Sequence, residues 1–191
     1  DQGTRPTLVF MASHIVAWHG TDKLIWLAEQ SPEFDFEIIG LAPSDFEVPL
    51  LENVHTHVFL SYEGYANIVG KCDLAIGTLA WHRVGLAEAS PLKVREYLAS
   101  GLPTIIAYRD ADFQDQPWYL LELPNEEFNV QRNLAKIKDF VWSMQGKRVS
   151  HDELRDRIDN GPKELKRLTF MSKVIQLTNS ANLGTAERVT V

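Results

Sequence analysis

The stretch E-A-S-P-L-K-V-R-E-Y-L-A-S-G-L-P-T-I-I-A-Y, residues 88–108, decides the fold of this chain. Its Ser90-Pro91 pair predicts the start of a helix over 91–100, because serine is a good N-cap and proline at the first helical position gives up an amide that would be unpaired anyway. Gly101 predicts the end of that helix through a left-handed C-cap. The residues from Thr104 to Tyr108 predict a strand, so a helix and a strand follow each other closely here.

The same alternation of short apolar strands and helices extends to both sides of this stretch. We expect further strands at Thr7–Ala12, Phe34–Ile39, Val54–Leu60, Asp73–Ile76 and Trp118–Leu123. We expect further helices at Asp22–Gln30, Tyr65–Lys71, Asn133–Gln145 and Asp152–Leu177, the last interrupted near Asn160–Pro162. Because parallel strands need crossovers, which are normally right-handed helices, the order predicts an α/β fold: a Rossmann-like doubly wound parallel sheet with C-terminal helices.

The length of 191 residues fits a single domain over 1–191. We place its core at about 7–125 and its C-terminal helices at about 133–178. Ligands of such sheets bind outside the carboxyl ends of the strands. The loops expected to carry function are therefore Ser13–Thr21, Leu41–Asn53, Ser61–Gly64 and Gly77–Ser90.

Composition excludes several classes of partner and site. The chain has 19 Lys and Arg against 26 Asp and Glu, a net charge of -7, and no basic run, which argues against nucleic acid as a partner. Its single cysteine, Cys72, excludes an intramolecular disulfide and a cysteine-rich metal site. No apolar stretch approaches the roughly 20 residues of a transmembrane helix. We expect a cytoplasmic location, which includes a peripheral position at the inner face of the membrane.

The mouth of the helix that starts at Pro91 is suited to an anion. The amides of Leu92 and Lys93, the helix dipole and the Lys93 ammonium together predict a site for a diphosphate, even on an acidic protein. The alternative is that Ser90 and Pro91 merely begin a helix and Lys93 is solvated.

Two carboxylates accompany this helix mouth. Glu88 precedes the helix and Glu96 lies about a turn and a half inside it, and helical side chains lean toward the N-terminus. Both carboxylates can therefore flank the mouth and accept hydrogen bonds from vicinal sugar hydroxyls. The alternative is that both are ordinary surface acids, with Glu96 pairing with Lys93.

The spacing of these residues resembles a known family signature. Glu88 and Glu96 have seven residues between them, and the residues that match a P-x-K-x-x-E-Y-L-A-x-G-x-P variant follow: Pro91, Lys93, Glu96, Tyr97, Leu98, Ala99, Gly101 and Pro103. This pattern resembles the E-x7-E signature of glycosyltransferase family 4. The segments 18–25 (W-H-G-T-D-K-L-I) and 36–40 (F-E-I-I-G) are similar to the family's K-G-x-D-x-L-I entry and its second strand.

The resemblance implies the C-terminal, donor-binding domain of a two-domain enzyme with the GT-B fold, whose N-terminal acceptor domain is absent from this chain. Glu96 would bind the ribose hydroxyls and Glu88, the catalytic candidate, would contact the transferred sugar. The amides near Leu92 and Lys93 would meet the phosphates of a nucleotide-diphosphate sugar, with Pro91 at the start of the helix. No metal and no cofactor is implied, because helix amides and cationic side chains stabilise the leaving diphosphate.

The sequence departs from the family where two cations are expected. His14 and His19 stand where members usually have an arginine and a lysine that contact the diphosphate, and histidine is a weaker, pH-dependent cation. Lys23 is an unlikely substitute if it faces solvent. Two further candidates are Tyr62, for the base, and Arg83, for the sugar or phosphate.

The sequence therefore predicts the donor-binding domain of a retaining glycosyltransferase of the hexosyltransferase type, with a role in polysaccharide or glycoconjugate synthesis. Alone it should bind its nucleotide sugar and hardly catalyse, because the acceptor half that positions the second substrate is missing. The alternatives are a non-catalytic Rossmann-like nucleotide-binding module and a nucleotide-sugar epimerase of the same architecture.

Overall fold

The computed structural model of the chain describes residues 5–58, 60–158, 161, 165 and 168–173. It consists of two compact units, Asp1–His151 and Asp152–Val191, so the single domain expected over 1–191 is described here as these two parts. Helix α6 (His151–Ile158) begins at their boundary, within the helix predicted from Asp152. The predicted interruption near 160–162 and the predicted end at Leu177 fall largely outside the described residues.

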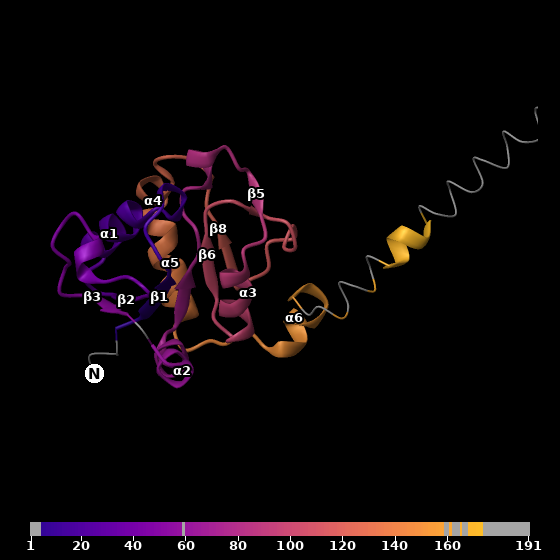
Figure 1. Cartoon of the computed structure of the whole chain (residues 1–191), viewed down its shortest axis with the longest axis horizontal. Coiled ribbons are helices and arrows are strands. Elements are labelled where there is room, and N and C mark those ends of the chain that lie inside the picture. Colours follow the sequence, from indigo (N-terminus) through magenta and orange to yellow (C-terminus); the bar gives the residue numbers. More distant parts are fainter. Residues whose placement is uncertain (1–4, 59, 159–160, 162–164, 166–167, 174–191) are drawn as a thin grey trace, which may run out of the picture. The chain divides into compact units, whose positions relative to one another are not determined.

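The first unit is built on a sheet of six parallel strands (Figure 1). In chain order they are β1 (Thr7–Met11), β2 (Asp35–Ile39), β3 (Val54–His57), β4 (Leu74–Ile76), β6 (Thr104–Ile106) and β8 (Leu120–Glu122). Their spatial order is β3-β2-β1-β4-β6-β8. Successive strands run outward from β1 in one direction and then from β4 in the other, which is the strand order of dinucleotide-binding folds. The predicted Rossmann-like parallel sheet is confirmed.

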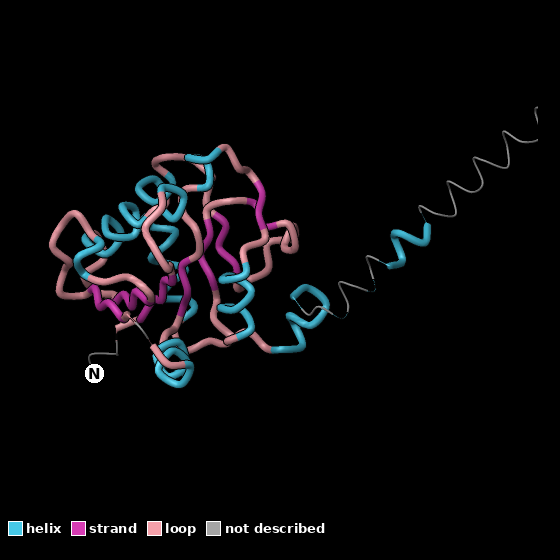
Figure 2. Tube along the Cα trace, in the orientation of Figure 1, coloured by secondary structure: helices cyan, strands magenta, loops and turns pink. Residues whose placement is uncertain are grey.

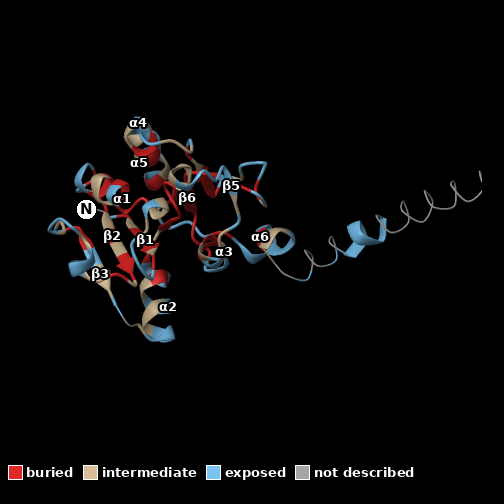
Figure 3. Ribbon diagram, turned by 45° about the horizontal axis from the view of Figure 1, so that its top comes forward, coloured by how far each residue is buried: buried red, intermediate tan, exposed pale blue. Residues whose placement is uncertain are grey.

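Helices cover both faces of this sheet, as its apolar strands require. Leu8 and Phe10 of β1 share one core with Leu24 of α1 (Thr21–Glu29) and Ile137 of α5 (Leu134–Met144). Val9, between them, is fully buried and points to the opposite face, because strand side chains alternate. On the ribbon coloured by burial the strands are mostly red and the outer turns of the helices pale blue (Figure 3).

The helix that follows β5 differs in one respect from the prediction. Helix α3 spans Leu92–Ala99, and its N-cap is Pro91, with no side-chain cap bond, rather than Ser90. The Ser90 hydroxyl instead donates to the Asp112 carboxylate over 2.9 Å. Tertiary contact therefore overrides the local capping preference that the sequence predicted. The predicted left-handed end of the helix is confirmed at Gly101, whose φ is 79°.

The other predicted elements exist, with shifted ends. Helix α2 spans Tyr62–Lys71, three residues longer at its start than predicted, because the Ser61 hydroxyl caps it by accepting from the Gly64 amide. A short helix, α4 (Asn129–Arg132), precedes α5. Figure 2 shows these helices together with long loops at the carboxyl ends of the strands.

Several short elements in those loops were not predicted. They are the 3-10 turns η1 (Ala17–His19), η2 (Pro43–Asp45) and η3 (Trp81–Val84), and the strands β5 (Glu88–Ala89) and β7 (Arg109–Asp110). The two strands form a separate parallel sheet in which Glu88 pairs with Arg109. Glu88 thus lies on a strand rather than in the loop that the sequence predicted.

Gly40, directly after β2, is a position where only glycine fits. Its φ is 93°, and a Cβ built there would lie 2.3 Å from the Ala12 carbonyl oxygen. We expect Gly40→Ala to lower the free energy of unfolding by more than about 2 kcal/mol, since both the backbone and the neighbouring carbonyl must move.

Urea unfolding followed by tryptophan fluorescence would measure this change. Gly70→Ala is the matched control, because Gly70 lies in α2 with nothing within 4 Å of a built Cβ. That variant should be neutral or more stable by roughly 0.5–1 kcal/mol. Equal losses in the two variants would contradict the steric argument.

Candidate functional site

The candidate site lies at the carboxyl end of the sheet, where the strand order reverses between β1 and β4. Ligands of open α/β sheets bind at this point, because the loops that leave the two strands diverge there. A hollow of about 410 Å³ opens here and is lined by Met11, Ala12, Ser13, His14, Trp18, His19, Ile39, Gly40 and Lys93. We call it the Lys93 hollow. It contains three of the predicted site residues: His14, His19 and Lys93.

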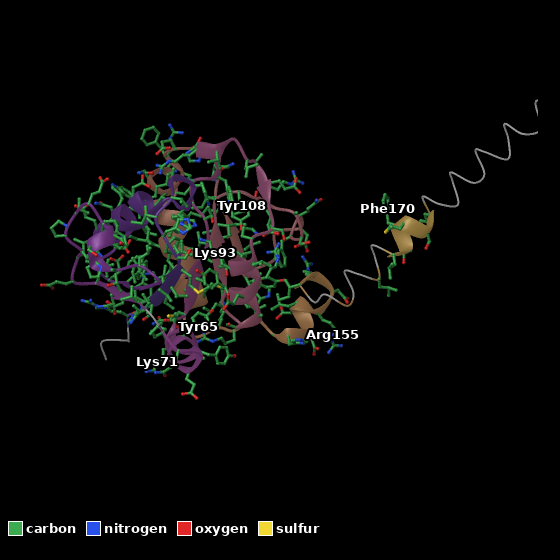
Figure 4. The ribbon with its side chains drawn as sticks, in the orientation of Figure 1. Tyr65, Lys71, Lys93, Tyr108, Arg155 and Phe170 are labelled. Atoms are coloured by element: carbon green, nitrogen blue, oxygen red, sulfur yellow. The ribbon has the colours of Figure 1, made fainter. Side chains whose placement is uncertain are left out.

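Lys93 reaches this hollow from the first turn of α3, contrary to the alternative in which it is solvated (Figure 4). Its ammonium donates to the Met11 carbonyl over 3.3 Å and lies 4.7 Å from the centre of the Phe10 ring. It forms no ion pair with any described carboxylate. Burial lowers the pKa of Lys93 to about 8. An ammonium with one carbonyl partner has two N–H donors left for an anion.

Tyr97, one turn after Lys93, fixes the helix to the same strand. Its hydroxyl, fully buried, accepts a hydrogen bond from the Met11 amide over 2.7 Å. Met11 is the last residue of β1, so Lys93 and Tyr97 satisfy its carbonyl and its amide. Side chains four residues apart lie on one face of a helix, which explains why this pair meets a single residue. Lys93 and Tyr97, two positions of the P-x-K-x-x-E-Y pattern, are therefore both held in place by their contacts with Met11.

His19 is a neutral group in this hollow. Burial, and secondly the Lys93 ammonium, lower its pKa to about 4. Its Nδ1 is buried without a hydrogen-bond partner among the described residues. The rings of His14 and His19 lie 6.2 Å apart, and the His14 Nδ1 lies 2.9 Å from the Ser13 hydroxyl. At neutral pH His19 can therefore form a hydrogen bond but carries no positive charge. It is a weaker substitute for the expected lysine than a protonated histidine would be.

The turn that carries His19 is tied to the loop after β4. The Leu79 amide donates to the His19 carbonyl over 3.1 Å, and the Trp18 and Trp81 rings stack 6.0 Å apart. Gly20, with φ 71°, allows the close approach, because a Cβ there would lie 2.8 Å from Leu79 Cβ. These contacts hold the His19 loop against the reversal point of the sheet.

The N-terminus of α3 is open to solvent. Leu92 is 85% exposed, and its amide and that of Lys93 belong to the first turn, where a helix has no acceptor of its own for them. Pro91 precedes them in extended conformation. Neither Pro91 nor Leu92 lines the Lys93 hollow. Their predicted contact with phosphate stays a prediction.

An ion-pair network that the sequence did not predict anchors α3 from its other side. The Arg95 guanidinium donates to the fully buried Asp110 over 2.8 Å and to Asp112 over 3.1 Å, and it also contacts the Ser90 hydroxyl. Its charge lies 5.0 Å from the centre of the Phe113 ring. Lys93 and Arg95, two residues apart, thus attach α3 to β1 and to β7. Each partner is distant in sequence, so no local pattern indicated this network.

The two signature carboxylates, Glu88 and Glu96, are exposed. Glu96 lies beside Tyr65 of α2, since burial first and then this carboxylate raise the pKa of the Tyr65 hydroxyl. Glu88 lies on β5. Neither lines the Lys93 hollow, so their contacts with a sugar stay predictions. Tyr62, the candidate for the base, is 84% exposed in the first turn of α2.

Arg83 lies outside the Lys93 hollow. Its guanidinium binds Asp22 through both carboxylate oxygens, at 2.8 and 2.7 Å, and also pairs with Glu127. It lines a second hollow of about 440 Å³ between the loops after β1 and β2, which we call the Arg83 hollow. Two carboxylates neutralise its charge, and the Arg83 guanidinium in turn lowers the pKa values of Asp22 and Glu127 through its hydrogen bonds to them. The structure therefore does not bring Arg83 together with Lys93.

Lys23 is buried, contrary to the solvent-facing position considered from the sequence. Only 1% of it is exposed, and its ammonium donates to the Glu126 carbonyl over 2.8 Å and to the Asn129 side chain over 3.0 Å. Lys23 thus joins α1 to the loop before α4 and takes no part in the Lys93 hollow.

Two negative findings concern the described residues only. No three His, Cys, Asp or Glu side chains among them come together in a way that could hold a metal ion. None of the helices described is both long enough and apolar enough to cross a bilayer.

Comparison with solved structures supports the fold. No protein-family model matches the chain, and no curated protein matches it. Solved structures do match. The chain is similar to the GtfA/B complex (TM-score 0.57, 16% identity, 90% of this chain and 36% of that chain). It is also similar to a UDP-forming alpha,alpha-trehalose-phosphate synthase from Burkholderia xenovorans (0.58, 12%, 90% and 44%) and to TarM (0.50, 14%, 92% and 35%).

These likenesses show the fold alone, because the identities are low. The first unit has the architecture of one half of a GT-B protein, and the chain spans less than half the length of each of these structures.

Proposed function

We propose that this chain is the donor-binding domain of a retaining glycosyltransferase and holds a nucleotide-diphosphate sugar in the Lys93 hollow. The observation that carries the proposal is the convergence of Lys93, His14 and His19 at the reversal point of the sheet. A single ammonium without a carboxylate partner beside two imidazoles is suited to a diphosphate. The GT-B fold and the E-x7-E resemblance support the same reading.

In this proposal the site works by electrostatic stabilisation. When the bond between the sugar and the diphosphate breaks, negative charge develops on the leaving diphosphate oxygens. The Lys93 ammonium, the imidazole N–H groups and the amides of Leu92 and Lys93 donate hydrogen bonds to those oxygens. No metal is needed for this role, and none is proposed. Glu96 would hold the ribose hydroxyls and Glu88 the transferred sugar, which keeps its anomeric configuration.

The acceptor would bind to a second domain that this chain does not contain. We propose that this second domain faces the donor-binding domain across the cleft of a GT-B enzyme. The whole enzyme would act in polysaccharide or glycoconjugate synthesis at or near the inner face of the membrane. Because the acceptor would be positioned by that domain, this chain alone should bind donor and turn over little.

A titration of the chain with nucleoside diphosphates and nucleotide sugars, followed by calorimetry, tests the proposal. We expect saturable binding of at least one nucleotide, and Glu96→Ala should weaken it by about tenfold, as the loss of a charge-assisted hydrogen bond does. Glu29→Ala, which removes an exposed acid at the end of α1, should leave the affinity unchanged. The absence of saturable binding to any nucleotide would overturn the proposed donor site.

A further inference from the structure

A third hollow lies outside the proposed donor site. Its volume is about 390 Å³, within the roughly 300–1,000 Å³ of typical ligand pockets. The polar side chains that line it, and that the argument below uses, are Tyr108, Arg109, Gln116, Glu122, Asn133 and Lys136. We call it the Tyr108 hollow. It shares no residue with the Lys93 hollow or the Arg83 hollow.

The Tyr108 hollow lies at the carboxyl ends of β6 and β8, the same edge of the sheet that bears the donor site. Tyr108 lies shortly after β6, Glu122 ends β8, and Lys136 lies in the first turn of α5. Arg109 lies on β7, directly opposite Glu88 on β5. The hollow therefore adjoins the strand that carries the proposed contact to the transferred sugar.

Two cations, Arg109 and Lys136, line this hollow beside a single carboxylate, that of Glu122. Neither Arg109 nor Lys136 forms a side-chain hydrogen bond or a close ion pair with a described residue, although both lie near enough to Glu122 to lower its pKa. Arg83 and Arg95, by contrast, each form close ion pairs with two carboxylates. On a chain of net charge -7, a hollow lined by two cations and one carboxylate favours an anionic ligand.

The remaining polar groups are suited to hydroxyls. Tyr108 is 1% exposed, and its hydroxyl has no partner among the described residues, a costly state for a buried polar group unless a ligand or water completes it. Asn133 donates to the Asn129 carbonyl, which leaves its side-chain oxygen available as an acceptor. Burial raises the pKa of Glu122, while the nearby Arg109 lowers it.

Gln116 holds its amide side chain at the wall of the hollow at a conformational cost. Its φ of 47° is the only positive value among the described residues other than glycine. A non-glycine residue in this region costs about 1–3 kcal/mol and persists where surrounding structure enforces it. Such outliers occur often at ligand sites.

We propose that the Tyr108 hollow binds an anionic carbohydrate, a sugar ring that carries a carboxylate or a phosphate. Arg109 and Lys136 bind the anionic group, and the side chains of Gln116, Asn133 and Glu122 bind ring hydroxyls. The proposal goes beyond the donor site, since its residues and its ligand are different. It can therefore hold or fail whether or not a nucleotide binds.

Titration by NMR of the isotopically labelled chain, in the absence of nucleotide, tests this proposal. The probes are glucuronate, glucose 6-phosphate, neutral glucose and inorganic phosphate. We expect at least one of the two anionic sugars to bind about tenfold or more tightly than both glucose and phosphate, with shifts at the side-chain amides of Gln116 and Asn133. Whichever anionic sugar binds more tightly identifies the preferred anionic group as a carboxylate or a phosphate.

Two variants distinguish a specific binding site from non-specific electrostatic attraction. Arg109→Gln combined with Lys136→Gln should abolish the preference for the charged sugar, and Lys71→Gln, at the exposed end of α2, should leave it unchanged. Phosphate alone binding as tightly as glucose 6-phosphate, or glucose binding as tightly as both anionic sugars, would overturn the proposal. So would the absence of binding, or shifts confined to the Lys93 hollow.

Discussion

Asp110→Ala should lower the free energy of unfolding of the first unit by about 3–5 kcal/mol, the largest stability effect that we expect in this chain. Asp110 is fully buried, and it holds Arg95, whose side chain is 11% exposed. The variant leaves the guanidinium buried with only Asp112 as an acidic partner. Urea unfolding followed by circular dichroism measures the change.

The control for Asp110→Ala is a surface pair. Glu126→Ala removes the carboxylate that binds Arg132, whose side chain is 64% exposed, and should cost no more than about 1 kcal/mol. The Glu126 carbonyl that accepts from Lys23 is untouched by this change. A loss below about 1 kcal/mol in Asp110→Ala would show that the buried pair does not anchor α3.

Lys93→Met should weaken the binding of a nucleoside diphosphate by roughly 100-fold, because a charge-assisted hydrogen bond contributes about 1.5–3 kcal/mol. Methionine keeps the length of the side chain and its contact with Phe10, so the fold should remain. Calorimetry measures the affinity, and circular dichroism checks the fold. Lys71→Met, which removes an exposed lysine of α2, should bind as the wild type does.

The same lysine gives the affinity a pH dependence of definite sign. Burial lowers the pKa of Lys93 to about 8 from 10.5, so the unliganded ammonium is lost as the pH rises through about 8 and the affinity for an anion falls with it. Between 8 and 10.5 the unfolded chain binds more protons than the folded chain, so the contribution of this group to stability rises with pH. An equal fall in affinity in Lys93→Met would contradict the assignment to Lys93.

Much of the architecture followed from local sequence. Runs such as Leu8 to Phe10, alternating with helices, predicted the parallel sheet, because both faces of such a strand must be covered. Gly101 predicted the left-handed end of α3, because glycine reaches positive φ without steric cost. The ends of the helices were less accurate, as α2 shows, since Ser61 caps it three residues before the apolar pattern begins.

The sequence by itself determined the fold class, the helix that carries Lys93, and the presence of His14 and His19 in the loop after the first strand. Only the tertiary structure decided which of the candidate residues meet. It brought Lys93 to His19, paired Arg83 with Asp22, buried Lys23 and joined Arg95 to Asp110. The physical reason is that propensity and periodicity act over a few residues, whereas a charge is satisfied by whichever group the folded sheet places beside it.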